Sequence, residues 1–142
     1  MIDPALAFQT AVRADLIGAP AVTALVPPDH VRANDARPEQ MPAIILAGAR
    51  TEYLGRAAGG QRVARVSLTL HIWAADDGDD TARLIGAAIH DALEFGPAAT
   101  PEITVDEWHP LSAVWLRDMQ GELALAHGVM ALDATVRWRV AP

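Results

Sequence analysis

The sequence contains no cysteine, which excludes disulfide bonds, thiolate catalysis and thiolate metal ligands. It also contains no lysine, so all 11 basic side chains are arginines. No apolar run approaches the roughly 20 residues that a membrane-spanning helix needs. Only two serines are present, Ser67 and Ser112, and neither lies in the Gly-x-Ser-x-Gly turn of a serine hydrolase. The sequence therefore gives no sign of covalent catalysis or of a membrane segment.

Length favours one domain, and the acidic charge favours either protein partners or simple solubility. The 142 residues carry a net charge of −7, which argues against a general phosphate-binding surface. We expect a single domain spanning residues 1–142. The acidic start, Met1-Ile2-Asp3-Pro4, leads straight into an amphipathic pattern and does not resemble a secretory signal. We therefore expect the protein to act where it is made.

The clearest structural pattern lies between residues 62 and 95. Apolar residues occupy every second position of a predicted strand over 62–73, namely Val66, Leu68, Leu70 and Ile72. The intervening positions, which we expect on the opposite face, are Arg65, Ser67, Thr69, His71 and Trp73. An acidic turn and an amphipathic helix follow, and Gly96-Pro97 ends that helix. This segment predicts a strand with one buried face, followed by a helix that covers a sheet.

Helix and strand signals alternate through the rest of the chain. We expect a helix capped by Asp3 that ends at Gly18, a short helix over 21–26 and a brief strand over 30–32. Further strands are predicted over 43–46 with a resumption at 51–53, and over 103–107, 113–117 and 130–140, with a turn at 118–121. These elements predict an α+β fold, with helices on one face of a mainly antiparallel sheet of four or five strands. We expect Trp108, Trp115 and Trp138 in the core or at subunit contacts.

A glycine-rich segment over residues 55–61 predicts a long, mobile hairpin tip. It lacks the Gly-x-Gly-x-x-Gly and lysine signatures of phosphate loops. Arg56 and Arg62 flank it, and together with Arg50 and Arg65 they form the one locally basic region. Two interpretations stay open, namely solvated charges or a contact loop for an acidic partner or for passing DNA.

Neither the acidic nor the histidine side chains form a recognisable metal motif. Four acids precede the central helix, Asp76, Asp77, Asp79 and Asp80, but their spacing does not match a calcium-binding EF-hand loop. Capping and a favourable interaction with the helix dipole explain them more simply. The five histidines show no metal-binding spacing. We therefore predict no metal and no cofactor.

A small enzyme or ligand-binding domain is one alternative function. It would need convergent polar groups, for which His71, Asp106 and His109 are the candidates.

Across nearly its whole length the chain resembles the tail terminator, or tail completion, proteins of long-tailed phages and phage-derived gene transfer agents. The similarity rests on the N-terminal helix, on a Val26-Pro27 turn, on Pro42 before the first long strand and on the helix after the central strand. The segments that carry it are Ala5-Leu6-Ala7-Phe8-Gln9, Val12-Arg13, Leu68-Thr69-Leu70-His71-Ile72-Trp73 and Ala134-Thr135-Val136-Arg137-Trp138-Arg139-Val140.

This resemblance implies a structural, non-enzymatic virion protein that assembles in the bacterial cytoplasm. It implies a homohexameric ring that caps the head-proximal end of the tail tube, stops its polymerisation and joins the head-side connector. The hairpin loop is then expected to touch the tail tube or line a channel through which DNA passes, with Gly55, Arg56, Gly59, Gly60, Gln61 and Arg62 as its residues. The half-polar sheet face is expected to make subunit contacts through His71, Trp73, Arg137 and Arg139. A tail tube subunit or another head-tail connector protein is the nearest alternative.

Overall fold

A computed structural model of the chain describes residues 1–33, 38–75, 79–120 and 123–140. The helices are α1 (Pro4–Ile17), α2 (Pro20–Thr23), the 3-10 turn η1 (Pro28–His30) and α3 (Asp80–Leu93). The strands are β1 (Val31–Ala33), β2 (Ala43–Ala57), β3 (Gln61–Ala75), β4 (Thr104–Trp108), β5 (Ser112–Gln120) and β6 (Leu123–Arg139). The predicted α+β class is confirmed, with more and longer strands than expected.

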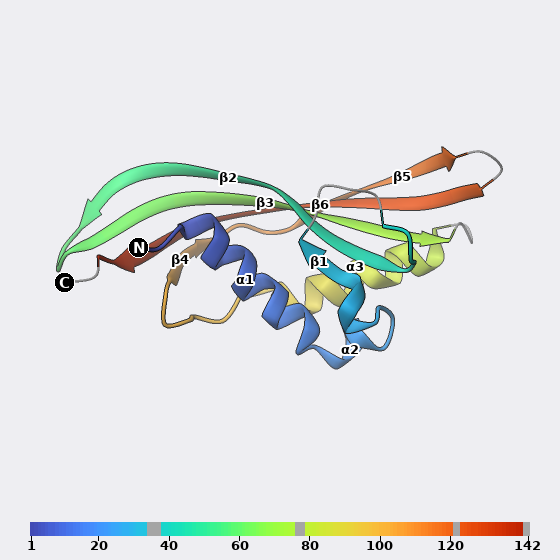
Figure 1. Ribbon diagram of the computed structural model, residues 1–142, viewed down its shortest axis with the longest axis horizontal. Helices are drawn as coiled ribbons and strands as arrows, with labels where there is room; N and C mark the ends of the chain where they lie inside the picture. Colours follow the sequence, from blue (N-terminus) through green and yellow to red (C-terminus); the bar gives the residue numbers. More distant parts are fainter. Residues whose placement is uncertain (34–37, 76–78, 121–122, 141–142) are drawn as a thin grey trace.

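The strands form one open six-stranded sheet with the order β1-β2-β3-β6-β4, and β5 also pairs with β6. All pairs are antiparallel except β1 with β2, which are parallel. The long strand β6 pairs with β3 along one side, and with β4 and then β5 along the other. Figure 1 shows the sheet as a long twisted ribbon that extends past the helices at both ends.

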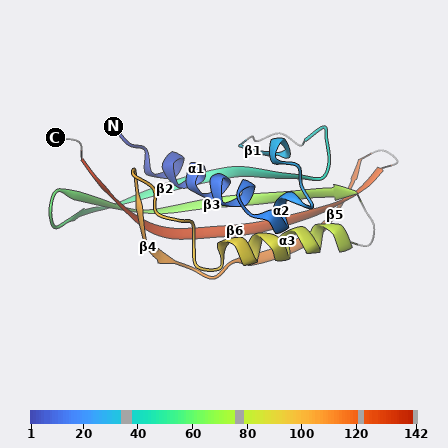
Figure 2. The same ribbon diagram turned by 90° about the horizontal axis from the view of Figure 1, so that it is seen from below.

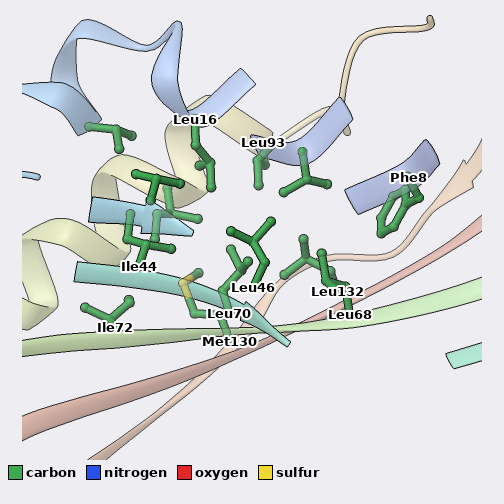
Figure 3. Close-up of a cluster of buried hydrophobic side chains, with 14 of the residues drawn as sticks. Phe8, Leu16, Ile44, Leu46, Leu68, Leu70, Ile72, Leu93, Met130 and Leu132 are labelled. Atoms are coloured by element: carbon green, nitrogen blue, oxygen red, sulfur yellow. The ribbon is translucent and has the colours of Figure 1, made fainter. Parts of the chain in front are cut away.

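All three helices lie on one face of this sheet, as the alternating sequence pattern predicted (Figures 1 and 2). Between them and the sheet lies a core in which β3 contributes Val66, Leu68, Leu70 and Ile72, each no more than 2% exposed. Phe8 and Leu16 from α1 and Leu93 from α3 point into the same core (Figure 3). Burial of these apolar side chains is the main force that holds the helices to the sheet.

Helix α1 begins where the sequence predicted. The Asp3 carboxylate accepts a hydrogen bond from the Leu6 backbone N–H at 2.8 Å, and Pro4 occupies the first turn. The second helix begins at Pro20, one residue earlier than expected, and ends at Thr23.

The predicted long hairpin tip is wrong, because the strands continue almost to its end. Pairing of β2 with β3 extends to Ala57 and Gln61, so the connection is only residues 58–60. Gly55, with φ 109°, lies at a register shift within the strand pair, whereas Gly59 and Gly60 make the turn with φ of 76° and 74°. Gly55, one of the glycines that suggested a loop, therefore lies in a β-bulge within the paired strands.

Other strands are also longer than the sequence predicted. Strand β2 is continuous where two pieces were expected, because a register shift between Ala47 and Arg50 absorbs the small residues. Residues 118–120 belong to β5 and not to a turn, since its pairing with β6 runs through to Gln120 and Leu123. Strand β6 accordingly starts seven residues earlier than the predicted 130.

The start of α3 differs from the prediction of capping by acids. Asp79 occupies the N-cap position, but its side chain makes no cap hydrogen bond, and its backbone has a φ of 69°. Asp80 lies in the first helical turn, where the helix dipole favours a negative charge. Asp76 and Asp77 lie outside the described residues. Among the helices that are described, none has the length and apolar character to cross a membrane.

Candidate assembly surfaces

The sheet face that carries no helix is the first candidate surface, and it has three distinct regions. Strand registers place His71, Trp73, Arg137 and Arg139 on this open face, between residues that point to the core. At the end near β5 the open face is apolar: Trp73 packs with Ala43 and Ile45, and all three are buried. At this end, the face that was predicted to be half polar is therefore an apolar cluster around Trp73.

Two histidines and Trp73 form a stack in that cluster. The indole of Trp73 and the imidazole of His127 are nearly parallel, with ring centroids 3.8 Å apart. His71 Nδ1 lies 2.9 Å from His127 Nε2, so one of these nitrogens donates a hydrogen bond to the other. Next to the stack, Val114 and Leu116 of β5 are 57% and 47% exposed. Solvent-facing apolar side chains beside aromatic rings are typical of protein contact surfaces.

The middle of the open face holds a polar cleft of about 220 Å³. Strands β2, β3 and β6 contribute its lining, Arg50, Glu52, Arg65, Ser67 and Asp133. Arg65 and Glu52 make a long ion pair of 3.9 Å. Asp133 Oδ1 is buried without a hydrogen-bond partner among the described residues.

The far end of the open face ties the β2–β3 turn to β6. Arg137 donates two hydrogen bonds to the Asp106 carboxylate, at 2.8 and 3.1 Å, and one to Gln61 Oε1 at 2.7 Å. The hydrogen bond to Asp106, together with its charge, raises the pKa of Arg137 above its ordinary value. Arg139 donates to the Gly59 carbonyl at 3.1 Å. Arg137 and Arg139 were predicted to make subunit contacts. Within the subunit they donate hydrogen bonds to Gln61 and Gly59, which belong to the predicted contact loop.

The helix-side face of the same hairpin is the second candidate surface. Arg56 and Arg62 lie directly opposite each other on β2 and β3, both exposed, and make no ion pair or hydrogen bond with any residue that the structure describes. Tyr53 is 68% exposed and its ring meets the edge of Trp138 at a centroid distance of 6.3 Å. Leu54, which is unpaired in the register shift between Tyr53 and Gly55, is also exposed. Arginine beside tyrosine is a frequent composition of interface hot spots.

The residues proposed for an enzymatic alternative serve other contacts. Asp106 binds Arg137, His71 contacts His127, and His109 donates its backbone N–H to the Asp133 carbonyl at 3.2 Å. Within the described ranges, no group of three or more histidine or acidic side chains is placed to hold a metal ion.

Sequence reasoning missed the cleft, although its residues occupy polar positions of the strands. The alternation identifies Ser67 and Asp133 as open-face residues, but only the register shows that they are direct neighbours, with Arg50 on the far side of Ser67. The sequence signal that could have indicated the cleft is the series of polar residues at every second position of these strands, on the open face.

Fold and surfaces together define a small α+β subunit with one helix-covered and one open sheet face. A family model described as tail completion protein gp17 matches residues 10–137. The chain therefore belongs to the gp17 family of tail completion proteins, which is a family of structural phage tail proteins and not of enzymes.

Solved structures with the same fold agree with that assignment. A chain from the virion of a native gene transfer agent particle is 17% identical, with a TM-score of 0.64, and the alignment covers 91% of this chain and 93% of that one. The gp17 protein of bacteriophage SPP1 is 15% identical, with a TM-score of 0.54 and coverage of 96% and 91%. No protein with a curated description matches the sequence. These two likenesses show a shared fold, and the structural role in a phage-type tail rests on the family match over residues 10–137.

Proposed function

We propose that this protein is a tail terminator, a subunit that assembles into a closed homohexameric ring at the head-proximal end of the tail tube. The ring stops polymerisation of the tube and joins it to the head-side connector. It is a virion protein of a phage or a phage-derived gene transfer agent, and it assembles in the bacterial cytoplasm.

Membership of the tail completion family over residues 10–137 carries this proposal. The arrangement of surfaces supports it, because a subunit with contact surfaces at different places can bind copies of itself head to tail. Such contacts are all satisfied when rotation closes the ring, which gives an assembly of fixed size.

Two groups of residues have assigned roles in this proposal. The hairpin end touches the tail tube or lines the channel, through Gly55, Arg56, Gly59, Gly60, Gln61 and Arg62. The open sheet face makes subunit contacts near His71, Trp73, Arg137 and Arg139. Trp73 is only 8% exposed and Arg137 is engaged with Asp106, so we expect these two to shape the surface more than to reach across it. The exposed side chains beside them, Val114 and Leu116, would then make direct contact.

Light scattering of the purified protein over a concentration series tests the proposal. A terminator gives one discrete oligomer, near six times the 15.1 kDa subunit, that does not grow further with concentration. Open-ended growth would contradict a terminator and identify a tube-like subunit. If the protein is monomeric alone, the same measurement is repeated with tail tubes, where a capped tube end is the expected result.

A further inference from the structure

Helix α3 has an outward face that carries two large exposed apolar side chains. Leu84 is 59% exposed and Phe95 is 90% exposed. Together with Ala87 and Asp91, which are also exposed, they recur every three or four residues and so share one face of the helix. Glu94 keeps helical backbone angles, so Phe95 continues this outward face just beyond the end of α3. The two apolar side chains start about 16 Å apart along the helix axis, at a rise of about 1.5 Å per residue.

The backbone next to Phe95 is held in place by its surroundings. Gly96 has a φ of 86°, and a Cβ added there would lie 3.2 Å from the Trp108 ring, so this turn packs closely against β4. Two residues further on, the Asp15 carboxylate of α1 accepts a hydrogen bond from the Ala98 N–H at 2.9 Å. A partner that buries the Phe95 ring therefore has little backbone to order, which favours binding.

The charges at this end of α3 favour a cationic partner. Asp91 lies in the last turn of α3 and Glu94 at its C-cap, where the helix dipole disfavours negative charge. His90 lies 3.6 Å from the Asp91 carboxylate. The one arginine of α3, Arg83, is at the opposite end of the helix, and the sequence has no other basic residue than histidine between 84 and 116. A positive charge brought by a partner to this end of α3 would interact favourably with both acids and with the dipole.

The outward face of α3 lies apart from the surfaces already assigned to other copies and to the tube. Helix α3 runs along the half of the sheet that is remote from the β2–β3 turn, on the helix-covered side (Figures 1 and 2). The proposed subunit contacts are on the open face, and the proposed tube or channel contacts are at the hairpin end. A second copy fits this face less well, because the one locally basic region of the chain belongs to that same hairpin.

We propose that the outward face of α3 binds the head-side connector, which presents two apolar pockets, for Leu84 and Phe95, and a cationic side chain beside the second. This contact rests on the proposed function and supplies a surface for the one partner to which no residues were assigned. Phe95 is the main anchor, because aromatic side chains in well-packed pockets contribute much of the binding energy of an interface. Leu84 makes the second contact and fixes the orientation of the helix.

Joining of tails to heads in vitro tests this contact. Tails are isolated from particles made with Phe95→Ala in place of wild type, mixed with tail-free heads, and joined particles are counted by electron microscopy. We expect tails of normal length but about tenfold fewer joined particles, as for loss of an interface anchor. Leu84→Ala should reduce joining in the same direction. Leu6→Ala is the matched control, because it removes a leucine that is 61% exposed from α1, and it should join normally.

Two readouts, tail length and joining, separate this contact from the terminator proposal. Normal joining with Phe95→Ala, or an equal loss with Leu6→Ala, would overturn the contact. Overlong tails with Phe95→Ala would make Phe95 a subunit or tube contact and would also overturn it. If Phe95→Ala blocks joining but tails end normally when the whole protein is absent, the contact stands and the terminator proposal is wrong.

Charge reversal at the end of α3 separates a role in binding from a role in stability. Asp91→Arg with Glu94→Arg should leave the melting temperature unchanged or raise it, because positive charge is favourable at a helix C-terminus. The same variant should lower joining about tenfold, because it repels a cationic partner. Normal joining by this variant would overturn the cationic partner.

The absence of cysteine allows the partner itself to be identified. Ala87→Cys, exposed between Leu84 and Phe95, is labelled with a benzophenone maleimide in isolated tails, which are then joined to heads and irradiated. We expect an adduct that forms only in joined particles and whose mass is not a multiple of 15.1 kDa. An adduct at twice 15.1 kDa, or the same adduct in free tails, would place a second copy or a tail protein on this face and overturn the proposal.

Discussion

Trp115 lies between two glycines, and this packing reverses the usual effect of an alanine substitution in a helix. A Cβ added at Gly86 in α3 would lie 2.4 Å from the indole Cη2. A Cβ added at Gly128 in β6 would lie 2.5 Å from Cζ3 of the same ring. Both distances are far below van der Waals contact, so a methyl group at either position would displace the ring or the backbone next to it.

Replacing a glycine inside a helix with alanine normally stabilises a protein by about 0.5 to 1 kcal/mol. Overpacking a well-filled site costs about 1 to 3 kcal/mol. We therefore expect Gly86→Ala to lower the free energy of unfolding by about 1 kcal/mol, the difference between the central values of these two effects. For a domain of this size the melting temperature should fall by about 3 °C for each kcal/mol.

Urea denaturation at fixed protein concentration measures the effect, because association would otherwise shift the apparent stability. In a Trp115→Ala background the clash is absent, so Gly86→Ala should stabilise the protein by about 0.5 to 1 kcal/mol. Ala87→Gly, at an exposed position of the same helix, is the control and should destabilise both backgrounds equally. Stabilisation by Gly86→Ala in the wild-type background would refute the reasoning.

Three further substitutions test the core, a helix cap and the hairpin. Trp138→Ala should destabilise the subunit by about 3 to 5 kcal/mol, because Trp138 is only 7% exposed, and an unchanged melting temperature would contradict its place in the core. Asp3→Ala removes the hydrogen bond to the Leu6 N–H and should cost about 1 kcal/mol in thermal unfolding, whereas Asp3→Asn should keep most of the stability. Arg56→Glu with Arg62→Glu should leave the melting temperature unchanged but impair tail completion; normal tail lengths with full infectivity or transfer would contradict a contact role for the hairpin.

The strongly periodic elements could be predicted from the sequence because each depends on local pattern and burial. Strand β3 alternates apolar and polar residues, and α1 carries its own capping residue, so both were recognised. The hairpin was misjudged because glycine suggests a turn wherever it occurs, while Gly55 occupies a bulge inside paired strands. The parallel strand β1 is three residues long, and its partner is fixed only by the folded sheet.

The assembly surfaces were predictable only in part. Alternation places His71 and Trp73 on the open face, but it cannot show that His127, distant in sequence, stacks on Trp73. The cleft depends on the register of three strands that brings Arg50, Ser67 and Asp133 side by side, and register is a tertiary property. For the same reason the sequence could not show that Arg137 is already held by an acid of β4.

The length of the tail tube tests the central claim most directly, because a terminator is defined by ending tube growth. Tails are measured by electron microscopy in particles produced with and without this protein, with a plasmid copy restoring it as the control. We expect tubes that extend beyond the uniform wild-type length when the protein is absent, and uniform tails when it is restored. Tubes of the same uniform length in its absence would contradict a terminator.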